Sequence, residues 1–514
     1  MHAVAATSMR RAAASLLARR RWIAFDLRAC GPTVTRGVAR TAPSAAAALN
    51  PCPSSSFSTT PSAAAPPRDA PRTSEVDGSD EVLGVMTPVT RRLWLARLAR
   101  QAAAGNAPPG TDTPVVLRAG EVPAEPTTIQ YPLASSPAMR AMYRNPWGAV
   151  RLGRVLEDLD SLAGSIALTH TDACAPGTRP PMLVTASVDA IRLHRPLPAQ
   201  ADLTAVGAVV WTGRTSMDIR IEVHDDDGGG SGGSGGGGGL AGSKLGAAPP
   251  ALAATFTFAC RDPDTAAPLI IPPLAAPTFP AAMAWWEERA AVAASRRAAR
   301  SAAPAGTTPA GVASPAAAAW VAALVAQART VAALPALAPP GVLLSSATSL
   351  SNSFICQPQQ RNLAGRIFGG LIMRRAFEVG FTCAYTFAGW RPRLVSVDEV
   401  AFLAPVDVGD LLSLRAAVLH TSISPGGRKG HVHVVVSAHV IRPEARTSAL
   451  SNTFHFRYGV DLHPGGSGGG DGSGPPASLR MVLPSSPEEA RLVAAHYPGR
   501  KKEREELDRE MEKS

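Results

Sequence analysis

The chain has 514 residues, 45% of them hydrophobic, with 51 Lys+Arg against 40 Asp+Glu and a formal net charge of +11. Residues 1–68 contain nine arginines, no lysine and one acidic residue, so they supply +8 of this charge and leave only +3 to the rest. So small a surplus excludes an electrostatic nucleic-acid footprint in the remaining chain, whose length allows two or three domains.

The first 70 residues have the composition of a transit peptide. They are rich in Arg, Ala and Ser, almost free of acids, and "MRRAAASLLARRRWIAF" can form a short basic amphipathic helix. We expect a mitochondrial matrix address. A chloroplast address has the same composition, and a disordered basic tail is the remaining alternative.

Cysteine spacing and hydropathy exclude two further classes. The cysteines at 30, 52, 174, 260, 356 and 383 form no CxxC pair, which argues against a disulfide framework or a zinc site and predicts that the last four are core thiols. The most apolar run, 316–326, is shorter than the roughly 18–20 residues that span a bilayer.

A repeat separated by about 217 residues organises the chain. Asn145 pairs with Asn362 and Gly153 with Gly370 when the two copies are aligned without a gap. The paired segments are, in order, 145–164 with 362–381, 183–202 with 394–410, and 254–262 with 452–460. A fixed order of recurring features indicates one supersecondary unit used twice.

Each unit predicts a helix followed by antiparallel strands. Apolar residues recur at helical spacing after each asparagine, whereas 216–223, 411–419 and 431–441 alternate or are rich in β-branched residues. We therefore expect an α+β fold, with each curved antiparallel sheet packed on a long helix by one face and open to solvent on the other.

The expected boundaries follow from composition. They are 1–70, transit peptide or disordered; 85–290, first domain with an N-terminal extension and a glycine-rich inter-strand loop at 225–239; 291–340, Ala/Pro-rich linker, partly helical; 341–460, second domain; and 461–514, flexible charged tail.

The glycines of "RNLAGRIFGGLIM" do not form a phosphate loop. A P-loop needs Lys-Ser/Thr after its glycines, and this segment continues Leu371-Ile372. A dinucleotide fingerprint needs G-x-G-x-x-G within a parallel βαβ unit, whereas the strands expected here are antiparallel.

Paired glycines at a helix start suit acyl transfer instead. Unpaired N–H groups there can stabilise negative charge on a carbonyl oxygen, and glycine lets a substrate approach the backbone. Gly369 and Gly370 are the candidate donors, with Asn362 orienting a carbonyl or water beside them. The alternative is that the two glycines only allow a tight passage from loop to helix.

A hydrolase also needs a base, and each predicted helix carries an acid beside its apolar stripe. If the copies pack as a pseudo-dimer, the acid of one faces the helix start of the other. Asp160 then completes the site of Asn362, Gly369 and Gly370, while Glu378 completes a second, degenerate site with Asn145 and Gly153. The alternative is that both acids are solvated.

Other side chains are weaker candidates. Cations for phosphate groups are available at Arg391, Arg393, Arg428 and Lys429, although an ordinary surface charge is the favoured interpretation of each. His431 and His433 share a strand face but lack a third ligand, so we expect them to face solvent without a metal. We also expect Trp285 and Trp286 to pack the linker on the first domain.

These segments, above all "RNLAGRIFGGLIMRRAFEVGF", "VRLGRVLEDLDSLAG" and "VSVDEVAFLAPVDVGDLLSL", resemble acyl-coenzyme A thioesterases with a tandem (double) hotdog fold, over roughly 85–290 and 341–460. The resemblance implies hydrolysis of acyl-CoA to fatty acid and coenzyme A, no metal or redox cofactor, no nucleic-acid partner, and assembly as a trimer of double hotdogs. It also implies the catalytic Asn role for Asn362 and the Asp role for Asp160.

One departure from the family pattern bears on mechanism. Many relatives have His-Gly-Gly where this chain has Phe368-Gly369-Gly370. A hotdog hydratase or dehydratase, the enzymatic alternative, needs a His–acid pair near the helix start, and neither asparagine loop contains a histidine. The non-enzymatic alternative is a protein that binds or senses acyl-CoA without cleaving it.

Overall fold

The computed structural model describes residues 86–103, 120–171, 180–226, 249–275, 283–291, 315–362, 365–398, 400–424, 426–463 and 475–496, together with 115, 117 and 294. All of them belong to Ser74–Ser514, the second of the two units into which the chain divides. The expected address, Cys174, residues 227–248 of the glycine-rich loop and the end of the tail lie outside the described residues.

Two helices of 20 residues each, α5 (Leu152–Thr171) and α8 (Gly369–Ala388), confirm the helix predictions. Their apolar stripes face inward: Val155, Leu156, Leu159 and Leu162 are at most 1% exposed. The chain leaves α8 through Gly389, whose φ of +67° is a left-handed conformation that glycine adopts without strain.

Each helix is accompanied by a set of antiparallel strands. The first set is β1 (Thr127–Tyr131), β2 (Met182–Leu193), β3 (Asp202–Thr212), β4 (Ser216–Asp226) and β5 (Leu252–Arg261). The second is β7 (Leu350–Ile355), β8 (Arg393–Val397), β9 (Val400–Ala401), β10 (Leu411–Ile423), β11 (Lys429–Arg442) and β12 (Thr447–Asp461).

These strands form one sheet with the order β1-β3-β4-β5-β2-β8-β12-β11-β10-β7, while β9 pairs with β2. The second half repeats the first in reverse order, as expected of two copies related by a pseudo-twofold axis. The halves join where Ile191 pairs with Val397 and Arg192 with Ser396. The repeat inferred from the sequence is therefore a tandem hotdog fold.

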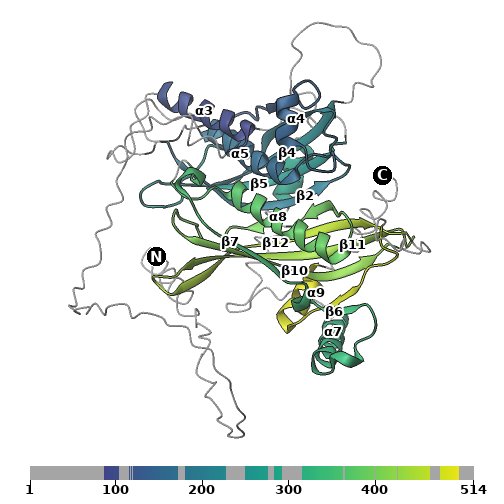
Figure 1. The fold of residues 1–514 in the computed structure, drawn as a ribbon. Helices are drawn as coiled ribbons and strands as arrows, with labels where there is room; N and C mark the ends of the chain where they lie inside the picture. The colour runs from purple at the N-terminus through teal and green to yellow at the C-terminus, as the bar shows by residue number, and fades with distance from the viewer. Residues whose placement is uncertain are drawn as a thin grey trace, which may run out of the picture. The chain divides into compact units, whose positions relative to one another are not determined.

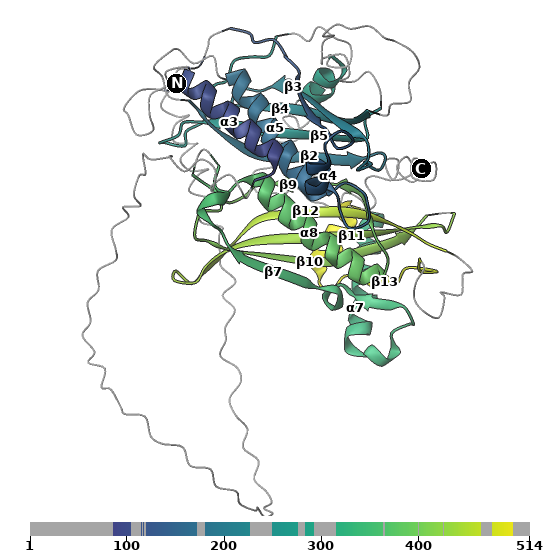
Figure 2. The ribbon, with the colours of Figure 1, turned by 45° about the horizontal axis from the view of Figure 1, so that its top comes forward.

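The two helices contact each other at this junction, and Figures 1 and 2 show them as neighbours. Their approach is close: a Cβ added to Gly370 would lie 2.9 Å from the backbone oxygen of Glu157. An ion pair of 2.8 Å between Arg374 and Glu157 links α8 to α5. The small residue and the ion pair together hold the two halves in register.

The N-terminal extension contributes α3 (Pro88–Ala103) and α4 (Pro137–Tyr143). The hydroxyls of Thr87, Thr90 and Tyr143 all donate to the fully buried carboxyl of Asp158 on α5. Burial raises the pKa of Asp158 to about 7, against the hydroxyl donors, which lower it. This cluster fastens the extension to the first central helix.

We expected the outer face of the first sheet to be open to solvent, but it is covered. Asp218 and Glu222 alternate with buried apolar residues as predicted, yet are only 4% and 2% exposed. Residues 283–291 cover them: Arg289 binds Asp218 at 2.7 Å, and Trp285 packs against this face. The expectation for Trp285 is thus confirmed, whereas Trp286 is 38% exposed and was wrongly predicted to pack.

A further layer covers the outer face of the second sheet. It consists of α7 (Pro315–Ala333), β6 (Val342–Leu344), β13 (Met481–Leu483) and α9 (Pro487–His496). Three short 3-10 helices also occur in the second half of the chain, η2 (Pro335–Leu337), η3 (Ser345–Thr348) and η4 (Pro358–Gln360). α7 and α9 share an apolar cluster with Leu419. The expectation of a flexible tail from 461 was therefore too broad, because 475–496 include β13 and α9.

Two sequence expectations concern the cysteine side chains and membrane-spanning segments. Cys260, Cys356 and Cys383 are buried, which confirms three of the four predicted core thiols. Burial raises the pKa of Cys356 and Cys383 to about 11, so these thiols are poor nucleophiles near neutral pH. No helix among the described residues is long and apolar enough to cross a membrane.

Candidate active site

The two aligned asparagines occupy equivalent turns before α5 and α8. Asn362 Oδ1 accepts from the backbone N–H of Arg366 at 3.2 Å, and Asn145 Oδ1 accepts from Ala149 at 2.9 Å. Gly365 and Gly148 have φ values of +76° and +85° in these turns. One clear role of each asparagine is therefore to close its own turn and aim the chain into the following helix.

The start of α8 receives a carboxyl group from the other half. A Cβ added to Gly369 would lie 3.4 Å from Asp160 Oδ2 and 3.2 Å from the ring of Phe402. Phe368 occupies the N-cap position of α8, and its side chain makes no capping hydrogen bond there. Asp160, Gly369 and Gly370 thus lie together between the halves.

Asp160 is held in an apolar surrounding with few compensating groups. It is 2% exposed; Oδ1 accepts from the Thr185 hydroxyl at 3.0 Å, while Oδ2 is buried and makes no hydrogen bond of normal geometry with the described residues. Burial raises the pKa of Asp160 to about 6, opposed by the Thr185 hydroxyl and the Gly370 backbone amide. The alternative that Asp160 is a solvated surface acid is therefore wrong.

The charged neighbours of Asp160 come from two helices. The guanidinium of Arg97 on α3 donates to the Ser161 carbonyl and lowers the pKa of Asp160, whereas Glu157 raises it. Sequence reasoning missed Arg97, Thr185 and Phe402. Only their positions in the fold identify them, because polar residues in apolar strands and arginines in extensions are common in proteins of every function.

The second composite arrangement differs at both critical positions. Leu152 stands where the other half has Gly369, and Phe377 lies fifteen residues after Asn362, as Asp160 does after Asn145. Glu378 comes near Gly153, with its Cγ 3.7 Å from an added Cβ. Its carboxylate, however, is paired with Arg374 at 3.1 Å and Arg375 at 3.4 Å.

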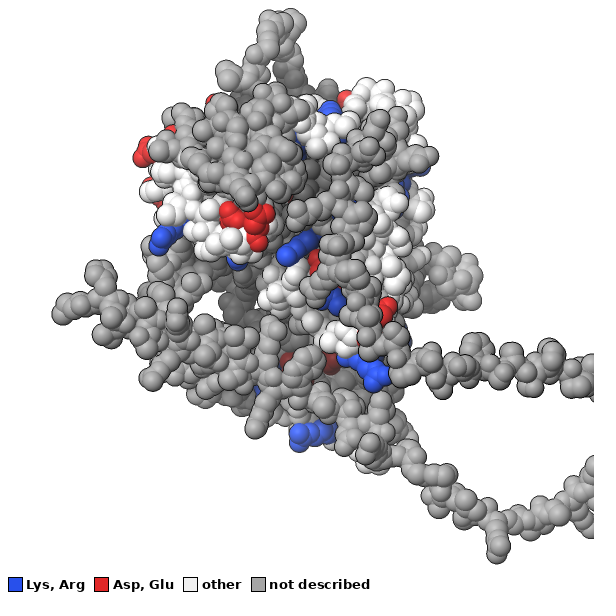
Figure 3. All heavy atoms as spheres, turned by 90° about the vertical axis from the view of Figure 1, so that its left-hand side faces the viewer, with Lys and Arg blue, Asp and Glu red and all other residues white. Residues whose placement is uncertain are grey.

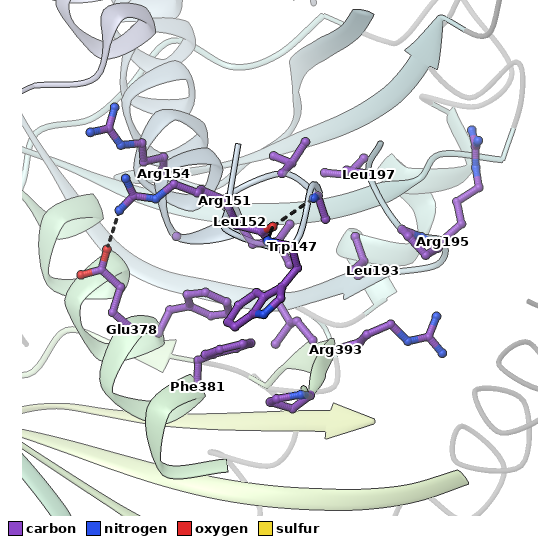
Figure 4. Close-up of a pocket in the computed structure, with 18 of the residues that line it drawn as sticks. Trp147, Arg151, Leu152, Arg154, Leu193, Arg195, Leu197, Glu378, Phe381 and Arg393 are labelled. Carbon is purple, nitrogen blue, oxygen red and sulfur yellow. Dashed lines mark hydrogen bonds and ion pairs between the residues drawn. The ribbon is translucent and has the colours of Figure 1, made fainter. Parts of the chain in front are cut away.

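A cavity of about 390 Å³ lies at this second arrangement (Figure 4). Asn145, Gly153 and Glu378 line it, and so does Arg393, one of the four candidate phosphate-binding cations. The structure thus separates two features that the sequence could not: the buried carboxyl of Asp160 lies at the start of α8, whereas this cavity lies at the start of α5.

The other three candidate cations lie in the second half of the chain. Arg391 is exposed and stacks at 5.5 Å over Trp390, while Arg428 and Lys429 follow each other in the β10–β11 turn and the start of β11. In Figure 3 the described part of one face shows separate basic and acidic side chains and no continuous basic patch.

We expected His431 and His433 to face solvent, but both side chains are buried. They are 7% and 5% exposed, because their side of the second sheet is the covered outer face. His433 Nε2 lies 3.3 Å from His455 Nδ1, which makes these two side chains neighbours in the sheet. Among the described residues, no group of three His, Cys, Asp or Glu side chains is placed to hold a metal ion.

The sequence is similar to proteins of known name. The sequence model of the thioesterase superfamily matches residues 152–231. Acyl-coenzyme A thioesterase 4, mitochondrial, of Humulus lupulus is 38% identical over 79% of this chain and 72% of its own length. Acyl-coenzyme A thioesterase 2, chloroplastic, of the same plant is 37% identical over 79% and 87%.

Animal relatives and solved structures also match. Acyl-coenzyme A thioesterase 9, mitochondrial, of Homo sapiens is 29% identical over 64% of this chain and 70% of its own length. A structure of acyl-CoA hydrolase from Staphylococcus aureus aligns at 23% identity with a TM-score of 0.27, covering 34% of this chain and 95% of that one. On the identity and coverage of the Humulus relatives, this chain belongs to the acyl-coenzyme A thioesterase family.

Proposed function

We propose that this protein hydrolyses acyl-CoA thioesters at the start of α8, with Asp160 as the general base. The observation that carries the proposal is the placement of a buried carboxyl, its Oδ2 3.4 Å from a Cβ built on Gly369, beside the first N–H groups of a helix. With a pKa of about 6, Asp160 is mostly ionised at pH 7 and remains basic enough to accept a proton.

Attack by water begins the reaction. Asp160 takes one proton from the water as the oxygen bonds to the thioester carbonyl carbon, and the carbonyl oxygen becomes an oxyanion. When the tetrahedral intermediate collapses, the C–S bond breaks and the proton on Asp160 passes to the departing sulfur. The products are a fatty acid and coenzyme A, and Asp160 is again ionised.

The oxyanion lies beside the backbone N–H groups of Gly369 and Gly370. In the unliganded protein the Gly370 amide stabilises the Asp160 carboxylate, as its effect on the pKa indicates. Once Asp160 is protonated it needs this donor less, at the moment when charge develops on the carbonyl oxygen. One strong oxyanion donor is worth about 3–4 kcal/mol of transition-state stabilisation.

Asn362 has two roles in this proposal. Its Oδ1 closes the turn before α8, and its amide Nδ2 orients the water or the thioester oxygen. Phe368 takes the place of a histidine and its ring packs against Gly370, so proton transfer falls to Asp160 alone. The α5 end lacks an unpaired acid among the described residues and is not expected to hydrolyse thioesters.

Steady-state hydrolysis by the purified chain tests the proposal, with acyl-CoA of several chain lengths and release of the free thiol as the signal. Asp160→Asn should lower kcat by about 10²–10⁴-fold without altering the fold. Glu378→Gln should change kcat little, because Glu378 is held by arginines. Equal and severe losses in both variants would contradict the assignment.

Matched asparagine variants separate the two roles of Asn362. Asn362→Asp keeps the oxygen that closes the turn but removes the Nδ2 donor, and Asn145→Asp makes the same change in the equivalent turn. The first should reduce kcat strongly and the second weakly, with both circular dichroism spectra unchanged. Similar kcat values for the two variants would limit Asn362 to a structural role.

The location and assembly of the protein are part of the proposal. The similar proteins of Humulus lupulus are named mitochondrial and chloroplastic, and residues 1–70 have a transit-peptide composition, so we place this protein in an organelle, with the mitochondrial matrix first. Fluorescence of a fusion carrying these residues tests the address. Light scattering tests a trimer of double hotdogs, expected at three times the chain mass.

A further inference from the structure

The cavity at the start of α5 has the lining of a binding site for an amphipathic molecule. Trp147, Phe377 and Phe381 line it, with Leu193 and Leu394. The rings of Trp147 and Phe381 lie 5.7 Å apart, and Trp147 is 41% exposed although it is a large apolar side chain. Figure 4 shows Trp147 and Phe381 in the middle of the cavity. Such walls suit an aliphatic chain.

Positively charged side chains outnumber acidic ones in the lining of this cavity, although Arg195 forms an ion pair with Asp225, which is not a lining residue. Four arginines line it against one acid, Glu378, which Arg151 approaches at 3.5 Å. In Figure 4, Arg151 and Arg154 lie on one side of the apolar middle, and Arg195 and Arg393 on the other. Arg393 is 4.0 Å from Asp461, the limit of an ion pair.

Arg154 is the cation with the least compensation. Its Nε is buried and has no hydrogen-bond partner in the described part of the chain. Burial and the neighbouring guanidiniums of Arg374 and Arg151 lower its pKa. An anion at this end of the cavity would relieve the repulsion among the arginines.

The same cavity lacks the groups that cleave a thioester at α8. Phe377 takes the position of the base, Leu152 takes that of Gly369, and Glu378 is neutralised by arginines. A thioester bound in this cavity would not be hydrolysed.

We infer that this cavity binds amphipathic anions, an aliphatic chain with an anionic head, and retains them without hydrolysis. A fatty carboxylate and an acyl-CoA share this chemistry. The inference stands on the cavity itself and does not require Asp160 to be the base.

Titration of tryptophan fluorescence tests the inference, with dodecanoate and with S-dodecyl coenzyme A, a thioether that cannot be hydrolysed. The full chain carrying Asp160→Asn is used, and the component of the signal lost in Trp147→Phe reports on the cavity. Binding should saturate, tighten about fourfold for each methylene added until the cavity is filled, and weaken at least tenfold in Arg154→Gln.

Phe381→Ala should flatten the dependence on chain length, and Arg329→Gln, a change to an exposed arginine on α7, should leave binding unchanged. Response to the thioether alone would identify the head as coenzyme A, and response to both would show that one carboxylate suffices. Unchanged Trp147-dependent binding in both Arg154→Gln and Phe381→Ala would overturn the inference, as would no saturation with either probe. Hydrolysis by the single variant Arg329→Gln should remain at the wild-type rate.

Discussion

The hydroxyl of Thr185 should set the pH at which the enzyme becomes active. It donates to Asp160 Oδ1 at 3.0 Å and favours the ionised form of this carboxyl. A hydrogen bond to a charged group contributes about 1.5–3 kcal/mol, and 1.36 kcal/mol corresponds to one pKa unit. Because the protonated acid keeps part of this bond and Thr185 is half-buried, we take the lower end, about one unit.

The predicted change follows from that shift. In the wild type, kcat/KM should rise about tenfold per pH unit at low pH and level off near pH 6, the pKa of Asp160. In Thr185→Val the inflection should move to about pH 7, so that the rate at pH 6 falls about fivefold while the rate at pH 9 changes little.

Initial rates of thiol release between pH 4.5 and 9 provide the measurement. Thr185→Ser retains the hydroxyl and should keep the inflection near that of the wild type. An inflection that stays in place in Thr185→Val, or that persists in the residual activity of Asp160→Asn, would refute the assignment of this ionisation to Asp160.

Three further predictions concern stability. The folded pKa of Asp160 is about 6, against the usual 3.8. The contribution of this group to stability is therefore complete below the unfolded pKa and is lost as pH rises through 6. Between pH 4.5 and 8, the free energy of unfolding of Asp160→Asn, measured in urea, should rise by about 2 kcal/mol relative to that of the wild type. Gly370→Ala places a Cβ 2.9 Å from the Glu157 backbone oxygen and should destabilise by about 1–3 kcal/mol with reduced kcat, whereas Gly153→Ala, with 3.2 Å to a Phe377 side-chain atom, should be milder; equal melting temperatures would contradict this. Arg374→Met leaves Glu157, 3% exposed, without its partner at 2.8 Å and should lose about 3–5 kcal/mol at pH 8, partly restored by adding Glu157→Gln.

The repeated unit was accessible from the sequence because its signals are local. Helical spacing of apolar residues predicts α5 and α8, alternation predicts β4, and paired asparagines and glycines reveal the duplication. These patterns depend on the helix period and the strand period, which any stretch of chain displays by itself. The composite placement of Asp160 against Gly369 could be proposed on the same basis, given two copies related by symmetry.

Burial and partnership were decided only by the tertiary structure. Two acids beside apolar stripes look alike in sequence, yet Asp160 is buried at 2% exposure while the Glu378 side chain is 33% exposed among arginines. The covered histidines, the folded residues 475–496 and the cavity at α5 also depend on segments far apart in the chain. The pKa of a carboxyl depends on the water and charges around it, and that surrounding exists only once both halves have packed together.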